Sequence, residues 1–210
     1  MRRAQRALLI ADRLDREYPD ARCELDFKSP WQLLVATVLS AQCTDRRVNE
    51  VTPELFRRWP DVSRLASADP AELESVIRPT GFFRNKAKSL INAARCIVAD
   101  HLGEVPKTLE DLVQLPGVGR KTAKVVLGEG FGIAAGVTVD THVKRLAGRF
   151  GLSERTNAEK VAEDLEQLLP KERWIGFSQR VIHHGRRVCH ARSPSCDGCA
   201  LLGVCLRRGV

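Results

Sequence analysis

The sequence of 210 residues lacks the features of membrane, secreted and all-β proteins. Aromatic side chains make up 5% of it, with one tyrosine, and alternating β-branched segments are scarce, which argues against a β-sandwich. No run of about 18 apolar residues occurs, so we expect no membrane span. Residues 1–19 are basic and amphipathic, without the apolar core and cleavage site of a secretory signal. We therefore expect a cytoplasmic protein without a signal peptide.

Positive charge, in contrast, is abundant. Thirty-four Lys and Arg residues face 26 Asp and Glu residues, which gives a net charge of +8 at pH 7. Charged residues make up 29% of the chain and hydrophobic residues 43%, a balance typical of a globular fold. The excess of positive charge favours a polyanionic partner, nucleic acid first and an anionic membrane second. A merely soluble basic protein is an equal alternative on charge alone.

Helix signals follow one another along the chain. The segment 29–32 (SPWQ) predicts a helix start, with the serine as cap, proline at the first helical position and the glutamine closing a capping box. The pattern recurs at 69–72 (DPAE), and a third box is predicted at 156–159 (TNAE), with the threonine as cap. Apolar residues recur at helical spacing over 85–103. The sequence predicts an all-α chain.

One segment predicts a site for phosphate. Residues 115–122 (LPGVGRKT) lie between a short predicted helix and one that begins near Arg120. The Gly117-x-Gly119 turn allows positive φ and lets N–H groups approach an anion, next to the positive end of the following helix. The spacing is neither that of a P-loop nor that of a dinucleotide fingerprint. A bare Gly-x-Gly would be a helix–helix turn, but this context is similar to a helix-hairpin-helix, which grips one DNA strand by its phosphates.

Lys121 follows this turn directly and falls in the first turn of the helix. A cation is disfavoured at that end of a helix, which favours the neutral amine. A neutral lysine is a nucleophile that can form a Schiff base. A charged lysine that only contacts phosphate is the alternative, and local sequence favours it.

Seven cysteines are present, and four of them lie in the last 22 residues: Cys189, Cys196, Cys199 and Cys205. An odd count without a signal peptide argues against a disulfide framework. The Cys-x6-Cys-x2-Cys-x5-Cys spacing predicts a metal site. Zinc and [4Fe–4S] both accept four cysteines, and the single short spacing favours the iron–sulfur cluster. Arg192 would lie on a basic finger facing an anion, and a solvated loop is the alternative.

The two motifs occur together with Leu39-Ser40-Ala41-Gln42 and Val139-Asp140-Thr141-His142. This combination resembles the endonuclease III family of helix-hairpin-helix DNA glycosylases, and the resemblance spans nearly the whole chain. It implies that Lys121 attacks the sugar and that Asp140 assists. From the residues alone, Asp140 is a helix N-cap, and both roles can hold together. The resemblance departs at Val113, where some members carry an acidic residue.

The resemblance implies further contacts with duplex DNA. A damaged base must leave the stack, and Gln42 would fill the space that it leaves. A second wedge would come from Phe82 or Phe83, whose apolar side chains suit insertion between bases. A polar helix end for Gln42 and core packing for the phenylalanines are the alternatives. The remaining expected DNA contacts are Gly117, Gly119, Arg120, His142 and Arg192.

The implied fold is all-α with two lobes and a cleft between them. Residues 23–133 would form a six-helix lobe, with the helix-hairpin-helix at about 108–128. Residues 1–22 and 134–210 would form the lobe with the [4Fe–4S] cluster, held in the loop 189–205.

The implied activity is excision of oxidised pyrimidines from duplex DNA and cleavage of the abasic site through a Schiff base. The expected partner is double-stranded DNA with a damaged base or abasic site, bound by a monomer associated with the nucleoid. Three alternatives are a monofunctional glycosylase of the same superfamily, a non-catalytic iron–sulfur DNA-binding protein and a zinc-stabilised DNA binder. Lys121 argues against the first of these.

Overall fold

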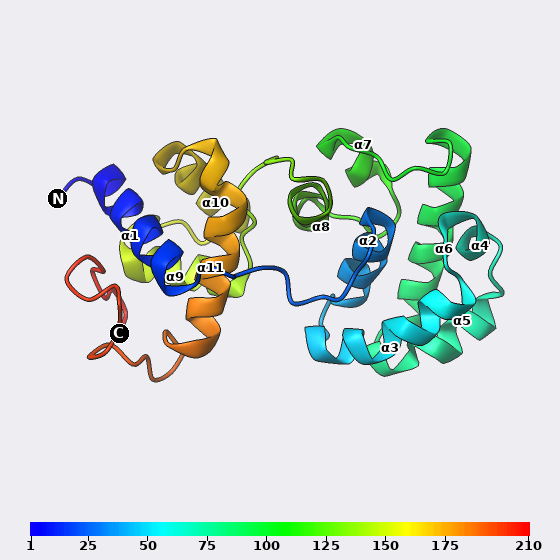
Figure 1. The fold of residues 1–210 in the computed structure, drawn as a ribbon, viewed down its shortest axis with the longest axis horizontal. Helices are drawn as coiled ribbons and strands as arrows, with labels where there is room; N and C mark the ends of the chain where they lie inside the picture. The colour runs from blue at the N-terminus through cyan, green and yellow to red at the C-terminus, as the bar shows by residue number, and fades with distance from the viewer. The chain divides into compact units, whose positions relative to one another are not determined.

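The computed structural model describes residues 1–210, and its regular secondary structure is entirely helical. Eleven α-helices are joined by loops and by short 3₁₀ and π turns (Figure 1), which confirms the prediction of an all-α chain. None of the helices combines the length and the apolar character that a membrane span needs. The chain divides into two compact units, a central unit, Glu24–Ile133, and a terminal unit formed by Met1–Cys23 and Ala134–Val210.

The central unit is a bundle of helices that contribute many buried apolar side chains. Its elements are α2 (Pro30–Leu39), α3 (Asp45–Arg58), α4 (Val62–Ala66), α5 (Pro70–Ile77), the 3₁₀ turn η1 (Arg78–Thr80), α6 (Phe83–Asp100), α7 (Leu109–Gln114), α8 (Arg120–Val125) and the π turn η2 (Val126–Gly130). Helix α2 is apolar on nearly all sides, and seven of its ten residues are buried, as its sequence predicts. Helices α4 and α5 both pack on α6, and α7 packs on α8.

Helix caps in the central unit follow the sequence closely. Ser29 Oγ accepts the N–H of Gln32 at 3.3 Å, and Asp69 Oδ1 accepts the N–H of Glu72 at 3.0 Å, as predicted. The prediction that Gln32 closes a capping box on the serine is wrong. Its Oε1 accepts the N–H of Lys28 at 2.8 Å instead, one residue before the cap. The helical spacing predicted over 85–103 corresponds to α6, which spans Phe83–Asp100.

The terminal unit joins the first helix of the chain to the last three. Its elements are α1 (Arg3–Glu17), α9 (Thr141–Phe150), α10 (Ala158–Leu168), the 3₁₀ turn η3 (Lys171–Arg173) and α11 (Trp174–Arg187). The predicted cap at Thr156 is wrong: Asn157 caps α10, and its Oδ1 accepts the N–H groups of Glu159 and Lys160. Asparagine is as good a cap as threonine, and Asn157 stands one residue closer to the buried apolar residues of α10.

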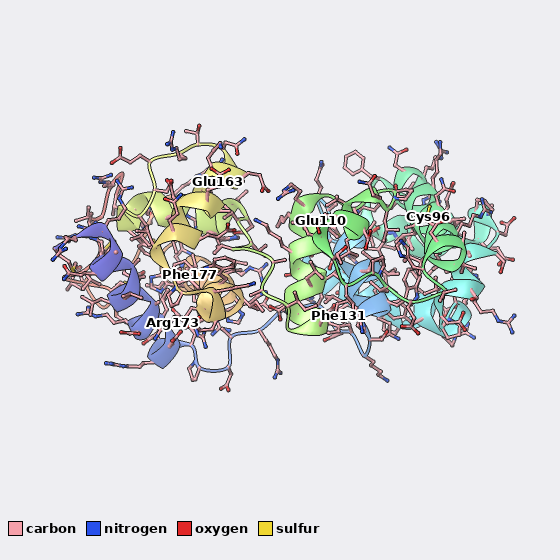
Figure 2. All side chains as sticks on the ribbon, turned by 90° about the horizontal axis from the view of Figure 1, so that it is seen from above. Cys96, Glu110, Phe131, Glu163, Arg173 and Phe177 are labelled. Atoms are coloured by element: carbon pink, nitrogen blue, oxygen red, sulfur yellow. The ribbon has the colours of Figure 1, made fainter.

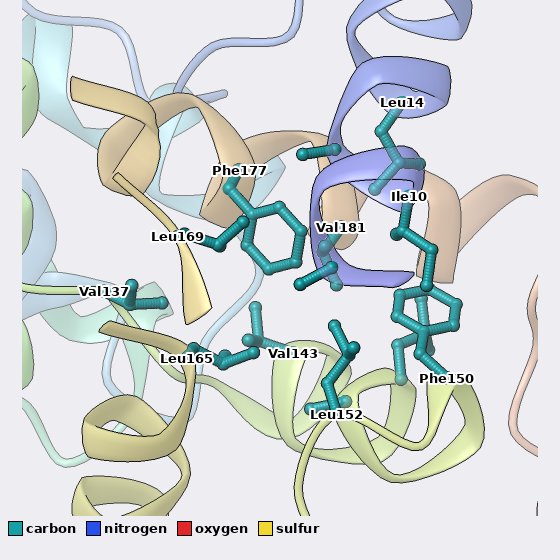
Figure 3. Close-up of a cluster of buried hydrophobic side chains, with 14 of the residues drawn as sticks. Ile10, Leu14, Val137, Val143, Phe150, Leu152, Leu165, Leu169, Phe177 and Val181 are labelled. Carbon is teal, nitrogen blue, oxygen red and sulfur yellow. The ribbon is translucent and has the colours of Figure 1, made fainter. Parts of the chain in front are cut away.

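Side chains from all four helices of the terminal unit meet in one core. Figure 3 shows Ile10 and Leu14 of α1 facing Phe150 of α9 and Phe177 and Val181 of α11. Leu165 adds the contribution of α10 to the same cluster. Residues 188–210 follow α11 and contain no helix. This tail therefore depends on other contacts for its position.

A charged contact on the surface also fastens α1 to the later helices. Arg173 Nη1 lies 2.6 Å from Asp12 Oδ1 and 3.4 Å from Asp15 Oδ2, and Figure 2 shows Arg173 beside the N-terminal helix. Arg180 Nη1 adds a contact of 3.1 Å to Asp15 Oδ1. These pairs are partly exposed, so each contributes little on its own, and the core holds α1 in place.

Candidate functional site

The turn between α7 and α8 is anchored by a glycine that no other residue can replace without strain. Gly117 has φ +81°, and a Cβ built on it would lie 2.6 Å from Ser89 Cβ on α6. The second glycine behaves differently, because Gly119 has φ −87° and a Cβ there would meet nothing within 4 Å. The positive φ predicted for the turn therefore belongs to Gly117 alone. Gly119 faces open space, where a bulky ligand can approach the backbone.

Helix α8 begins immediately after this turn. Gly119 is its N-cap, and no side chain caps the helix. The first N–H groups of a helix have no intrahelical acceptor, and they carry the positive end of its dipole. Arg120 and Lys121 are both exposed in this first turn. The arrangement offers backbone donors and two long cationic side chains to an anion, with Lys121 accessible to a reacting carbon.

In the terminal unit, Asp140 is held at both carboxylate oxygens. It caps α9, since Oδ1 accepts the N–H of Val143 at 2.8 Å, which confirms the N-cap prediction. Oδ2 lies 2.8 Å from Nδ1 of His142. The Asp140 side chain is 14% exposed and that of His142 is 26% exposed. A carboxylate fixed in this way is pre-oriented to hold a proton or to face a developing positive charge.

The two candidate wedge segments both lie in the central unit and share an unusual backbone conformation. Gln42 (φ +54°) and Phe82 (φ +48°) are left-handed without being glycine, and both side chains are exposed. Phe82 is 62% exposed. Phe83 is half-buried, with the guanidinium carbons of Arg78 and Arg84 at 5.9 and 5.6 Å from its ring centre. The structure thus distinguishes the two phenylalanines, and only Phe82 projects into solvent.

All four C-terminal cysteines line one small cavity of about 20 Å³ in the terminal unit. Its other walls include Phe150, His184 and Leu201. No group of three or more His, Cys, Asp or Glu side chains is arranged to hold a single metal ion.

Hydrogen-bond donors point at three of these sulfur atoms. Cys189 Sγ lies 3.2 Å from Arg149 Nη1, Cys199 Sγ accepts the N–H of Leu201 at 3.4 Å, and Cys205 Sγ accepts the N–H of Arg207 at 3.3 Å. Burial raises the pKa of Cys199 and of Cys205 as free thiols. Donors aimed at sulfur are what thiolate ligands of a metal group need, because they stabilise negative charge on the sulfur.

Arg149 is the main polar support of the tail, and sequence analysis missed it. It is 6% exposed, and besides Cys189 it donates to the carbonyl oxygens of His190 at 2.6 Å and Ala191 at 2.8 Å. Arg145 donates to the carbonyl oxygens of Gly185 and Cys189 from the same helix. The available sequence signal was an arginine between Leu146 and Phe150 on the apolar face of α9.

A second missed contact reaches Cys199 from Tyr18, the residue at the C-terminal end of α1. The Tyr18 hydroxyl lies 3.0 Å from His184 Nδ1, and His184 Nε2 lies 3.5 Å from Cys199 Sγ. Burial lowers the pKa of His184 to about 4, so the ring is neutral at pH 7. A neutral ring carries one proton on its two nitrogens, so it donates to one of Tyr18 and Cys199 and accepts from the other.

The predicted site residues are divided between the two units. Lys121, Arg120, both turn glycines, Gln42 and Phe82 belong to the central unit. Asp140, His142 and the four cysteines belong to the terminal unit, together with Arg192, which is exposed in the loop between Cys189 and Cys196.

Comparison with known proteins identifies the family. Residues 35–171 match the family model of the HhH-GPD superfamily of base excision DNA repair proteins. Endonuclease III of Synechocystis sp. is 55% identical over 203 residues, which cover 97% of this chain and 91% of that protein.

Two solved structures are similar over almost the whole chain. A non-covalent endonuclease III–DNA complex matches with a TM-score of 0.92 at 40% identity, covering 98% of this chain and 96% of that one. A trapped endonuclease III–DNA covalent intermediate matches with a TM-score of 0.91 at the same identity and coverage. The chain belongs to the endonuclease III family of the HhH-GPD superfamily, bifunctional DNA repair enzymes that combine DNA glycosylase with abasic-site lyase activity.

Proposed function

We propose that this chain binds duplex DNA, removes oxidised pyrimidine bases and cuts the strand at the resulting abasic site, with Lys121 as the nucleophile. The observation that carries the proposal is the exposed Lys121 in the first turn of α8, directly after the Gly117–Gly119 turn. The hairpin would hold the strand by its phosphates through the uncapped N–H groups of α8 and through Arg120. A trapped covalent complex with DNA in a relative of the same fold supports a covalent mechanism.

The reaction proceeds in two stages on one lysine. The neutral amine of Lys121 forms a bond to C1′ of the sugar while the bond from C1′ to the base breaks. The base leaves with that electron pair and takes up a proton, and the attacking nitrogen loses one. The nitrogen lone pair then forms a double bond to C1′ while the C1′–O4′ bond breaks. O4′ leaves with that electron pair and takes up a proton, so the sugar opens and a protonated imine remains. This imine acidifies C2′, so loss of a C2′ proton expels the 3′ oxygen with its phosphate and cuts the strand.

Asp140 is assigned the accompanying proton transfers. Its carboxylate is fixed by the N–H of Val143 and by His142, so it needs no reorientation during the reaction. It would stabilise positive charge as the sugar–base bond breaks and would then carry protons to and from the reacting atoms. His142, which was predicted from sequence as a DNA contact, is assigned the additional task of orienting this carboxylate.

Gln42 and Phe82 are assigned to the space in the duplex that the flipped base leaves. Both are exposed on turns of the central unit, and Phe82 offers the apolar side chain that inserts between bases. Phe83 packs between two arginines and is assigned to the structure of the loop instead.

Cys189, Cys196, Cys199 and Cys205 are proposed to hold a [4Fe–4S] cluster. The residues fit this group, because four thiols line one cavity and donors face three of the sulfur atoms. Four thiols that line one cavity suit a cluster in which each cysteine would bind a different iron. The bound cluster would cross-link the tail and brace the basic finger that carries Arg192.

The proposal is tested by trapping the imine with borohydride on a duplex that contains one oxidised pyrimidine. We expect covalent protein–DNA product with the native chain and none with Lys121→Ala. Lys160→Ala serves as a matched control, because Lys160 is an exposed surface lysine paired with Glu163. An undamaged duplex should give no product.

Other outcomes separate the alternatives. An alkali-labile abasic site without trapping would show a monofunctional glycosylase in which Lys121 only contacts phosphate. Neither product over a panel of lesions would support a non-catalytic DNA-binding protein. Iron and acid-labile sulfide in the purified protein would separate the cluster from zinc.

A further inference from the structure

A buried lysine connects the two turns that carry Gln42 and Phe82. Lys86 lies in the first turn of α6 and is only 6% exposed. Its ammonium donates to the carbonyl oxygen of Leu39 at 2.8 Å and to that of Thr80 at 2.8 Å. Burial lowers the pKa of Lys86 from its ordinary value, and the two carbonyls supply the polar contacts that a buried cation needs.

Each of these carbonyls stands just ahead of a candidate wedge. Leu39 is the last residue of α2, three positions before Gln42, and Thr80 ends η1, two positions before Phe82. Carbonyls at the end of a helix lack intrahelical donors, so an outside donor satisfies them. The backbone N–H of Lys86 also donates to the carbonyl of Phe82 at 3.1 Å. That bond belongs to the α6 main chain, whereas the ammonium is the part of Lys86 that reaches both turns.

Both turns need such a restraint. A left-handed backbone is unfavourable for Gln42 and Phe82, and such conformations persist only where the surroundings fix them. The two side chains are exposed and so contribute little packing of their own. Contacts behind the turns must then supply the restraint, and the Lys86 ammonium provides one shared by both.

We propose that Lys86 is a positioning residue that fixes the spacing between Gln42 and Phe82, so that both enter the duplex as one preformed unit. The wedge roles rest on the function proposed above, whereas the coupling of the two turns does not. Without the ammonium, two buried carbonyls lose their donor, and both turns should loosen together.

Hydrogen–deuterium exchange on the full-length protein tests the coupling directly. In Lys86→Met, we expect exchange about tenfold faster at both 40–44 and 80–85, with α9 unchanged. Lys88→Met is the matched control, because it removes an exposed lysine from the same helix. Unchanged exchange in both segments, or faster exchange in only one, would overturn the coupling. If Lys86→Met does not fold, Lys86→Gln is judged by the same criteria, because its amide lies one bond closer to the main chain and cannot bridge the two carbonyls as the ammonium does.

Kinetics then test the consequence for the reaction. The single-turnover rate constant of base excision should be about tenfold lower in Lys86→Met. The rate constant of β-elimination at a preformed abasic site should fall less than about threefold, because no base must be displaced there. When Lys86→Met is added to the double variant Gln42→Ala/Phe82→Ala, the excision rate should fall less than about twofold further. The reason is that Lys86 acts on excision by positioning those two residues. Equal losses in both reactions, or a full additional loss in that background, would overturn the positioning role. If exchange is faster in both turns but the excision rate is unchanged, the coupling stands and the wedge assignment is refuted.

Discussion

In the central unit the functional turn is anchored by close main-chain packing, whereas in the terminal unit the cysteine segment is anchored by charged and polar contacts. Gly117 sits against Ser89 of α6, and the helices on both sides of the turn contribute buried residues such as Leu112 and Ala123. The tail after α11 has few buried apolar side chains, among them Leu201 and Val204. The hairpin turn is therefore positioned by close packing, and the tail by individual hydrogen bonds.

This difference predicts how each region tolerates change. A segment held by packing fails when atoms are added, because a dense interior cannot give way. A segment held by a few polar contacts fails when one donor is removed, because buried acceptors then remain unsatisfied. Substitutions that add or remove groups therefore separate the two modes of support.

The largest effect on stability is expected from Cys199→Ser. Loss of one ligand of the proposed cluster should release the cross-link of the tail and cost about 3 kcal/mol. In a chain of this size each kcal/mol moves Tm by about 2–4 °C, so Tm should fall by about 10 °C. DNA affinity should fall in parallel. Thermal unfolding, iron content and DNA titration provide the measurements, with Cys96→Ser in α6 as a cysteine control outside the cluster segment. Unchanged stability and affinity would show that the cysteines do not brace the tail.

Arg149→Met should sharpen the comparison by removing the polar support while keeping most of the apolar stem. The carbonyls of His190 and Ala191 would lose their donor, at a cost of about 2–3 kcal/mol in the free energy of unfolding. Urea denaturation measures this cost, and Arg155→Met, at an exposed arginine, provides the baseline. Equal midpoints for the two variants would mean that packing alone holds the tail.

The two glycines of the hairpin turn offer a paired test of packing in the central unit. Gly117→Ala should lower the free energy of unfolding by about 1–3 kcal/mol, because a methyl group at φ +81° would overlap Ser89. Gly119→Ala should stay within about 0.5 kcal/mol of the native chain, because its Cβ meets nothing. If the open backbone at Gly119 receives a phosphate, this second variant should nevertheless bind DNA more weakly. Equal stability losses in the two variants would contradict the packing argument.

The smallest expected effect is a gain in stability, at Leu102. Leu102 is 95% exposed and left-handed, with φ +55°, so it contributes little packing to offset its backbone strain. Asparagine tolerates this conformation better, and Leu102→Asn should raise the free energy of unfolding by about 0.5 kcal/mol. A lower unfolding midpoint in urea would show that the exposed leucine has a contact that stabilises the native chain.

Sequence predicted the helices well because their signals are local. Ser29 and Asp69 cap helices as predicted, since a cap needs only a side-chain oxygen next to a free N–H. At Thr156 and Asn157 two good caps stand side by side, and local chemistry could not decide between them. The choice between Phe82 and Phe83 was equally undecided, because it depends on where α6 begins.

Lys86 and Arg149 could not be predicted, because nothing local distinguishes a buried cation from an exposed one. Each is satisfied by backbone carbonyls, which every residue has, and the acceptors of Arg149 lie more than 40 residues away. The only hint is position: both cations fall on the apolar face of their helices, among residues such as Ala87 and Phe150. Supports of this kind appear only when the chain is folded.

The discontinuity of the terminal unit has a consequence for the order of events during synthesis. Helix α1 leaves the ribosome before the central unit, whereas Phe150, Phe177 and Val181, which bury it, are made only after the whole of that unit. The central unit is contiguous and can fold while the rest is being translated. Helix α1 must wait unburied until α9 and α11 emerge, and its apolar face is the part of the nascent chain that a chaperone would cover.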